Sequence, residues 1–343
     1  MRDSILYSAT RSFFVAMFAV IGFCFALLIL ALGISLLSST TSTEPRSNYD
    51  IEVLANANGK REALYSQPVI LRINIEGIIG LDKLDQSSIR QMLVESREGL
   101  LKDDLVKGVL LYLQTPGGTV TDADGIYRAI KTYKEQYKVP VYAYVDGLCA
   151  SGGMYIAAAA DKILASDTSI VGSIGVIAPS ALNVSQLLEK IGVQSLTLYA
   201  GKGKDDLNPL RPWKPGEQDN YKNLIDYYYA DFVNIMTTNR PMLDKAKLEN
   251  EYGAKIFPAS EAKTLGYIDE SGVSLREAIE QLVKQMGIED DNYRVVQMNK
   301  QTWVTELFQT QLGLLSGTVK HQLQLSPEYD PKLLNQFQYM FRP

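Results

Sequence analysis

Residues 106–118, VKGVLLYLQTPGG, and residues 139–153, VPVYAYVDGLCASGG, decide the fold class of this chain. Each stretch opens with an apolar run, Val106–Leu113 and Val139–Val145, of the kind typical of parallel strands that are buried on both faces. Each run ends in small residues, and a helical pattern follows it. Strand and helix alternating in this way predict an α/β fold with right-handed crossovers.

The same alternation extends along residues 68–289, which we expect to form one folded domain. Residues 38–67 before it are polar and irregular, as expected of a linker. Residues 290–343 after it form a Gln-rich appendage, and the sequence does not indicate its role. Inside the domain, further short strands are predicted at Lys162–Ala165, Gly175–Ile177 and Ser195–Tyr199.

A long helix is predicted after Pro215, and it carries a cluster of tyrosines. Aromatic rings of this kind bury large areas, so we expect a packed helix surface or an oligomer contact rather than a ligand cage. The cluster consists of Tyr221, Tyr227, Tyr228 and Tyr229.

The composition argues against several classes of function. The net charge of −5 argues against a nucleic-acid partner, because such proteins carry basic patches. With two cysteines and one histidine the chain cannot supply a structural zinc site, and the sequence predicts no metal or cofactor. Cys24 lies in an apolar segment far from Cys149, so a disulfide between them is not expected. A Ser-His-Asp triad would need His321 to fold back from the appendage, which we do not expect.

Phe13–Leu37 is almost entirely apolar and is predicted to be a transmembrane helix. It would span ~37 Å, enough to cross a hydrocarbon core of about 30 Å. The alternative is a cleaved secretory signal, but its apolar region is shorter and ends at a small-residue site, and no clear site of that kind follows here. Arg2 and Arg11 precede the segment, so we expect residues 1–12 to be cytoplasmic and the large domain to lie on the extracytoplasmic side of the cell membrane.

Ser151 stands where a strand ends and a helix rich in small residues begins. A hydroxyl at that junction lies near a helix N-terminus, where free N–H groups favour a developing negative charge. Gly152 and Gly153 would let a substrate backbone come close. The alternative is a serine that only caps the helix. The nucleophile motif of α/β-hydrolases does not fit, because Cys149 stands where its first glycine belongs.

Two further loops could contribute to chemistry. Thr115–Gly118 follows a buried strand, and its two glycines could present N–H groups to an oxyanion, although an ordinary strand-to-helix turn would look the same. Lys204 lies in a loop after a predicted strand, and a lysine can act as a base only if burial or a neighbouring cation lowers its pKa. A solvated lysine is the alternative, and the adjacent carboxylates of Asp205 and Asp206 oppose a basic role.

In order and spacing, these motifs resemble those of signal peptide peptidase A, of the protease IV family of S49 serine peptidases. The resemblance runs from about Pro68 to Gly287, most of the part after the apolar segment. It rests on five segments of this chain: Thr115–Gly118, Ala150–Gly153, Val171–Val176, the Gly201-x-x-Lys204 loop and Ala259–Glu270.

The resemblance implies a Clp/crotonase-type spiral of ββα units and a Ser-Lys dyad that hydrolyses peptide bonds. By motif, Ser151 matches the nucleophile and Lys204 the general base, with Lys202 as a competing candidate two residues earlier. Ser173 matches a serine that positions the lysine amine. The oxyanion-hole donors match the N–H groups of Gly118 and Gly152.

The chain carries one copy of these motifs and so resembles the short form of the family, which implies a dome-shaped homo-oligomeric ring whose active sites combine residues of neighbouring protomers. The implied substrates are hydrophobic or unstructured peptides, such as released signal peptides. Two alternatives remain open: an enzyme that acts on acyl-CoA and shares the crotonase-type spiral, and a membrane scaffold of the same fold that has lost turnover.

Overall fold

The computed structural model describes residues 5–39, 49–61, 67–99, 101–288, 292–300 and 336–341 of the 343-residue chain. The chain divides into two compact units, Met1–Ser47 and Asn48–Pro343. The first unit contains one long helix, α1 (Ile5–Ser39). Its central 24 residues, Thr10–Gly33, have a mean hydropathy of 2.9 and are long and apolar enough to cross a membrane. Such a helix is a candidate membrane span by length and composition.

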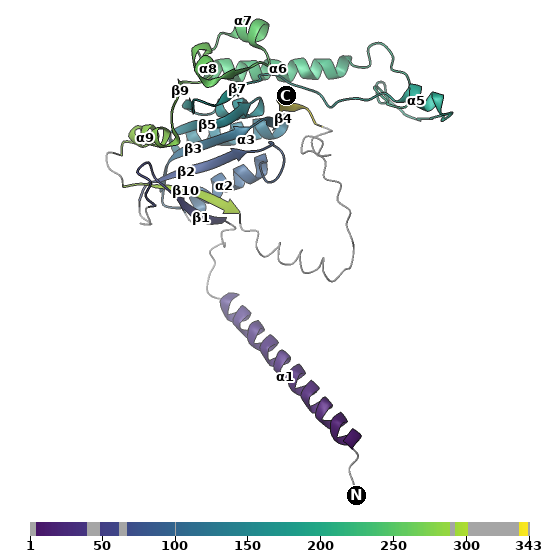
Figure 1. Cartoon of the computed structure of the whole chain (residues 1–343), viewed down its shortest axis with the longest axis vertical. Coiled ribbons are helices and arrows are strands. Elements are labelled where there is room, and N and C mark those ends of the chain that lie inside the picture. The colour runs from purple at the N-terminus through teal and green to yellow at the C-terminus, as the bar shows by residue number, and fades with distance from the viewer. Residues whose placement is uncertain are drawn as a thin grey trace. The chain divides into compact units, whose positions relative to one another are not determined.

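The second unit is built on a mixed sheet of nine strands (Figure 1). Its main path runs in the order β1 (Tyr49–Leu54), β10 (Arg294–Lys300), β2 (Val69–Glu76), β3 (Val106–Thr115), β5 (Val141–Ala150), β6 (Lys162–Ala165) and β9 (Glu270–Ser271). From β10 to β9 neighbouring strands are parallel, while β1 is antiparallel to β10.

Two short strands extend this sheet beside the end of β5. β7 (Ile170–Gly172) pairs in parallel with β5, and β8 (Ile256–Pro258) pairs with β7 in the antiparallel sense. A separate two-stranded sheet joins β4 (Gly117–Thr119) to β11 (Gln338–Met340). These small additions all lie at the carboxyl ends of β3 and β5, where ligands of open α/β sheets bind.

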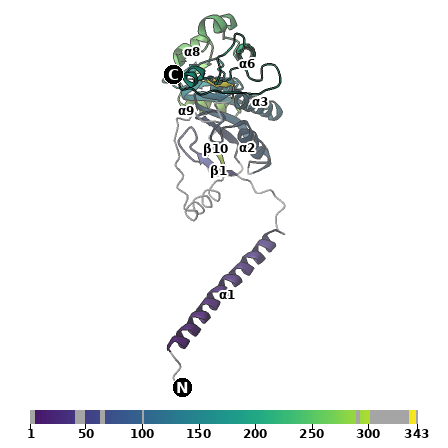
Figure 2. The same ribbon diagram turned by 90° about the vertical axis from the view of Figure 1, so that its right-hand side faces the viewer.

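Helices cover both faces of the large sheet, and Figure 2 shows α3 and α9 on opposite sides of it. One face packs against helices α2 (Gln86–Glu98), α3 (Val120–Tyr137), α4 (Gly152–Ala157) and α6 (Asp219–Asn239). The other packs against α9 (Leu275–Gln285). The remaining elements are α5 (Ser185–Lys190), α7 (Lys245–Lys247), the π-helical turn Leu248–Tyr252 and α8 (Ala259–Leu265).

The continuous apolar strands divide their side chains between these two cores. In β2, Leu71 and Ile73 point into the core under α2 and α3, while Ile70 points into the core under α9. Side chains of a strand alternate between the faces of its sheet, so a strand covered on both faces needs apolar residues at successive positions. The predicted α/β fold with parallel crossovers is confirmed.

The sheet extends beyond both ends of the expected domain 68–289. β1 lies inside the expected linker, and β10 lies inside the expected appendage. The two strands pair with each other, Tyr49 opposite Lys300 and Leu54 opposite Val295, and so form one edge of the sheet. Each strand finds its partner nearly the whole domain away in sequence, which a local pattern does not reveal.

Two of the predicted short strands do not form. Ser195–Tyr199 forms no strand ladder with the part of the chain that the structure describes, and Leu196 and Leu198 are 84% and 85% exposed. In place of a strand at Gly175–Ile177 there is a single bridge between Ile177 and Gln338. Alternating residues favour a strand only where a ladder partner is present, and one protomer supplies none for Ser195–Tyr199 among its described residues.

Residues 178–215 form a projection that we call the arm, and it contains α5 (Figure 1). Most of its residues are exposed. Nine large apolar side chains of the arm are exposed to solvent in one protomer: Leu182, Leu187, Ile191, Val193, Leu196, Leu198, Tyr199, Leu210 and Trp213.

Candidate active site

Ser151 occupies a sharp turn between β5 and α4. Its backbone has φ 56° and ψ −115°, a region that only glycine adopts without cost. The side chain makes no capping hydrogen bond to α4, is 1% exposed, and its Oγ has no hydrogen-bond partner among the residues that the structure describes. An ordinary helix cap would accept a bond from the first turn. The capping alternative therefore does not hold for Ser151.

Ser173 is brought next to Ser151 by the pairing of β5 with β7. In this parallel register Ala150 faces Gly172, so the two serines follow at the same edge of the sheet. The backbone N–H of Ser151 donates to the carbonyl oxygen of Gly172 at 2.9 Å. Ser173 also has a positive φ, 54°, and is 5% exposed. Its own N–H donates to the carbonyl oxygen of Lys255 at 2.7 Å, which fixes the turn.

Gly118 lies in β4, between two backbone segments. On one side, Ile79 N–H donates to Gly117 O at 2.9 Å and Thr119 N–H donates to Ile79 O at 3.0 Å. Since successive N–H groups of a strand point to opposite sides, the N–H of Gly118 points to the other side, toward β11. A side chain is excluded here, because a Cβ at Gly118 would lie 1.9 Å from the Ile79 carbonyl oxygen.

Gly152 is the first residue of α4, so its N–H has no acceptor within the helix. It lies close to Gly117: a Cβ on Gly117 would be 2.9 Å from Gly152 N and 2.0 Å from the carbonyl oxygen of Tyr339. Four of the five site residues expected from sequence, the two serines and the two glycines, therefore gather where β4, β5 and β7 end.

A segment that the sequence did not assign to the site lies directly beside it. In β11, Gln338 faces Thr119, Tyr339 faces Gly118 and Met340 faces Gly117. On its other side β11 exchanges hydrogen bonds of 3.0 Å with Ile177. We call the space between β4 and Ile177 the peptide groove, because it holds an extended backbone bonded on both edges.

Lys204 is exposed and lies on the arm. It does not bond Ser151 within one protomer, since Ser151 Oγ has no partner among the described residues. Lys202 is likewise exposed on the arm. The structure thus brings the two serines and the two glycines together, whereas Lys202 and Lys204 lie elsewhere, on the arm.

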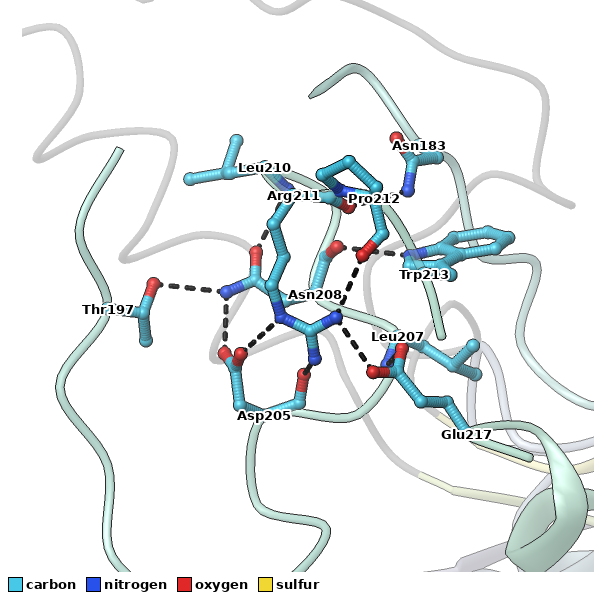
Figure 3. A network of polar contacts seen from close by, with 10 residues as sticks. All are labelled: Asn183, Thr197, Asp205, Leu207, Asn208, Leu210, Arg211, Pro212, Trp213 and Glu217. Atoms are coloured by element: carbon cyan, nitrogen blue, oxygen red, sulfur yellow. Dashed lines mark hydrogen bonds and ion pairs between the residues drawn. The ribbon is translucent and has the colours of Figure 1, made fainter. Parts of the chain in front are cut away.

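The loop around Lys204 is held by one arginine (Figure 3). Arg211 Nε donates to Asp205 Oδ2 at 2.5 Å, another of its nitrogens donates to the Asp205 carbonyl oxygen, and Nη1 lies 2.7 Å from Glu217 Oε1. Asn208 Nδ2 donates to Asp205 Oδ1 at 2.6 Å. The contacts from Arg211 and Asn208 to Asp205 restrain the residue that follows Lys204.

The same contacts change the charge balance next to Lys204. Hydrogen bonds from Arg211 and Asn208 hold the pKa of the Asp205 carboxyl below its usual range. Burial works to raise the pKa of Glu217, but its bonds to Arg211 and to backbone N–H groups lower it overall. Asp205, one of the two carboxylates expected to oppose a basic lysine, is thus already paired with Arg211.

Cys149 is fully buried two residues before Ser151. Burial raises the pKa of its thiol well above the ordinary value. Since the thiolate is the reactive form, this cysteine is not a competing nucleophile.

A strained serine at the end of a central parallel strand, beside a glycine strand that can bind a peptide backbone, defines an α/β protein of the Clp type. The family model for Clp protease matches residues 64–170, and the model for Peptidase family S49 matches residues 133–289. A provisionally named protease of the cyanobacterium Synechocystis is 33% identical over 203 residues, which cover 59% of this chain and 69% of that protein. The chain belongs to peptidase family S49.

Two further relatives share this similarity. A protein of Enterococcus faecium, provisionally named signal peptide peptidase SppA, is 34% identical over 238 residues and matches 66% of each chain. A provisionally named protease of Methanocaldococcus jannaschii is 38% identical over 175 residues, which cover 51% of this chain and 55% of that protein. The chain thus matches between about half and two thirds of the length of these relatives.

Proposed function

We propose that this protein is a serine peptidase in which Ser151 is the nucleophile. The observation that carries the proposal is the buried Ser151 hydroxyl, held on a strained turn with no hydrogen-bond partner among the described residues. Strain and an unmet hydroxyl both cost stability, and such costs persist mainly where function requires them. Membership of peptidase family S49 supports the same conclusion.

In the proposed reaction, Lys204 is the general base and Gly118 and Gly152 form the oxyanion hole. The neutral amine takes the proton of Ser151 Oγ while the oxygen attacks the scissile carbonyl carbon. The two backbone N–H groups bind the resulting oxyanion. The lysine then gives its proton to the leaving amine, and water hydrolyses the acyl-enzyme by the same route. The proposed role of Ser173 is to orient the amine.

Lys204 is proposed to come from a neighbouring protomer in a homo-oligomeric ring. Two observations support this arrangement: Lys204 does not bond Ser151 within one protomer, and the arm that carries it exposes nine large apolar side chains. Exposed apolar surface of that extent is typical of a contact with another chain. The peptide groove suits hydrophobic or unstructured peptides, since a folded chain cannot offer an extended segment.

The apolar helix α1 is proposed to anchor the enzyme in the cell membrane. With Arg2 and Arg11 on the cytoplasmic side, the catalytic unit would face the extracytoplasmic side, where signal peptides released into the bilayer are within reach.

The first test compares the full chain in detergent with its Ser151→Ala variant on an unstructured, fluorescently quenched peptide. We expect the variant to lose at least about 10³-fold in kcat/KM, and to lose labelling by a fluorophosphonate probe, because the nucleophile is gone. Lys204→Ala should lose as much, while the matched variant Lys202→Ala should keep activity within about tenfold. Cleavage by Ser151→Ala at the wild-type rate would refute the assignment.

The shared site is tested by mixing two inactive variants. Ser151→Ala chains can donate a lysine, and Lys204→Ala chains can donate a serine, so co-assembled rings should regain about a quarter of wild-type activity if each site spans one heterologous interface. A mixture that stays inactive, although an affinity tag carried by only one variant co-purifies the other, would place both groups in one protomer. An active monomer would have the same consequence.

A further inference from the structure

The hydroxyl of Thr115 joins two backbone segments next to the candidate active site. β3 ends at Thr115, and β4, which carries Gly118, begins at Gly117. Thr115 Oγ1 donates to the carbonyl oxygen of Gly77 at 2.5 Å and accepts from the backbone N–H of Gly117 at 3.0 Å. One side chain thus links the loop after β2 to the start of β4.

Burial makes the bond to β4 depend on this hydroxyl. Thr115 is 0% exposed, and Gly117 is buried as well. A buried N–H that loses its partner keeps the full cost of its removal from water. A side chain without a hydroxyl at position 115 would therefore leave the turn between β3 and β4 without its internal bond.

The direction of the Gly118 N–H follows from the same contacts. This N–H shares a planar trans peptide bond with the carbonyl group of Gly117, so the two groups point in opposite directions. Gly117 O accepts from the N–H of Ile79 at 2.9 Å, which turns the Gly118 N–H away from Ile79. Ile79 follows two residues after Gly77, whose carbonyl oxygen Thr115 binds. Thr115 therefore restrains both segments that set this direction.

The backbone of β4 needs such a restraint, because it opens with two glycines. Gly117 has φ 99°, a conformation that other residues rarely adopt. Glycine has more conformational freedom than any other residue, so two in succession resist a fixed direction of their N–H groups. A bond from a buried side chain supplies what the glycines lack.

The methyl group of Thr115 contacts the helix that carries the other proposed donor, Gly152. A Cβ on Gly153 would be 2.6 Å from Thr115 Cγ2, so the methyl group packs directly on the backbone of α4. The parallel register of β3 and β5 also places Thr115 opposite Cys149, two residues before Ser151. One buried side chain thereby contacts the supports of both N–H groups.

From this geometry we propose that Thr115 is a positioning residue of the peptidase reaction, whose hydroxyl and methyl groups hold the N–H groups of Gly118 and Gly152 in the direction that an oxyanion needs. It acts through the two glycines and not on the substrate itself. The proposal rests on the proposed function, in which these N–H groups form the oxyanion hole. A misplacement of about 1 Å can lower a reaction rate about 100-fold.

Two substitutions in the full chain separate the hydroxyl from the methyl group. Thr115→Val keeps the shape of the side chain and removes the hydroxyl. We expect it to lower kcat on the quenched peptide about 100-fold and to leave KM within about threefold, because an oxyanion hole acts in the transition state. Thr115→Ser keeps the hydroxyl and should retain kcat within about fivefold of wild type. If Thr115→Val turns over as fast as Thr115→Ser, the proposal is overturned.

The matched control is Ser96→Ala on α2, outside the candidate active site. Ser96 is also 0% exposed, and its hydroxyl makes two contacts, a bond of 2.7 Å to the carbonyl oxygen of Leu93 and one of 3.0 Å with the phenol of Tyr133. Both Ser96→Ala and Thr115→Val should lower Tm, since each leaves buried polar partners unpaired. Only Thr115→Val should lower kcat. An equal loss of kcat in both variants would reduce Thr115 to a structural role.

A further variant covers the case in which Thr115→Val does not fold. Thr115→Ala opens a space in which a water molecule can bind the freed groups, so it places less demand on folding. Such a water lacks the covalent restraint of the side chain, and kcat should fall about tenfold. If Thr115→Ala matches Thr115→Ser in kcat, the hydroxyl does not position the site.

Hydrogen exchange separates this proposal from the proposed function, because it needs no turnover. Amide exchange of the segment 114–119, followed by mass spectrometry, should be at least about tenfold faster in Thr115→Val than in Thr115→Ser. If the wild type does not cleave peptides but this contrast holds, the peptidase function fails and the restraint by Thr115 stands. If the wild type cleaves and the two variants exchange and cleave alike, the function stands and the positioning role fails.

Discussion

Replacing Ser151 should raise the stability of the protein while it removes activity. The Ser151 hydroxyl is buried with no hydrogen-bond partner among the described residues, a situation that costs about 1–3 kcal/mol. Ser151→Ala removes the hydroxyl but keeps the backbone strain, so we expect a gain of about 1 kcal/mol. Ser151→Gly also relieves the strain of the positive φ, which should stabilise the folded state by about 1–3 kcal/mol. The greater conformational freedom of glycine in the unfolded chain opposes this gain by about 0.5–1 kcal/mol. The expected gain for Ser151→Gly is then about 2 kcal/mol.

Thermal unfolding of the full chain in detergent, followed by circular dichroism, can measure these gains. For a domain of this size 1 kcal/mol corresponds to about 2–4 °C in Tm, so the alanine variant should melt about 3 °C and the glycine variant about 6 °C above wild type. The matched control is Ser274→Ala. Ser274 caps α9 in a capping box with Glu277, so its loss should lower Tm by about 3 °C.

The opposite result would refute the reasoning. If Ser151→Ala lowers Tm as much as Ser274→Ala does, Ser151 is a structural cap and the strained-nucleophile argument fails. If the glycine variant is no more stable than the alanine variant, the backbone at Ser151 is not strained.

Three further predictions concern the surroundings of the site. The pKa values of Asp205 and Glu217 are lowered from their ordinary 3.8 and 4.5, so hydrogen-exchange protection of their loop should be complete above pH 4.5 and be lost as the pH falls through the two folded-state pKa values, below 4.5 for Glu217 and below 3.8 for Asp205. In a variant whose other cysteine is serine, Cys149 should not react with a thiol reagent at pH 8 until the chain unfolds, because it is buried. Gly118→Ala should cost at least about 3 kcal/mol in urea unfolding, since its Cβ would lie 1.9 Å from the Ile79 carbonyl oxygen; a milder loss would mean that the loop can move.

The central part of the fold could be predicted because the residue pattern within each strand shows whether one or both of its faces are buried. Val106–Leu113 and Val139–Val145 are apolar at successive positions, which is required where helices cover both faces of a sheet. The site serines and glycines follow from the same logic, since the carboxyl ends of neighbouring parallel strands meet at one edge. Ser151 and Ser173 become neighbours only through the pairing of Ala150 with Gly172, a register that the local sequence pattern did not predict.

The sequence did not predict the strands whose ladder partners are distant in the chain. β1, β10 and β11 are short strands near the two ends of the second unit, and their ladders join residues more than 200 positions apart. β11 has no strong apolar run of its own, and Tyr339 becomes a core residue only because Tyr155 and Phe232 receive it. The predicted strand at Ser195–Tyr199 does not form for the converse reason, since the described residues of one protomer offer it no ladder partner.

The unpredicted features near the site share one physical cause: they involve groups whose partners lie far away in the chain or, in the proposed ring, in another protomer. Among the described residues of one protomer, the Ser151 hydroxyl has no hydrogen-bond partner, and nine large apolar side chains of the arm that bears Lys204 are exposed. A second copy that buries the arm would bring the amine, and the gain from covering the apolar side chains would offset the cost of desolvating it. In the proposed ring, activity would therefore depend on assembly, because the contact that covers the arm is the one that would bring the amine to Ser151.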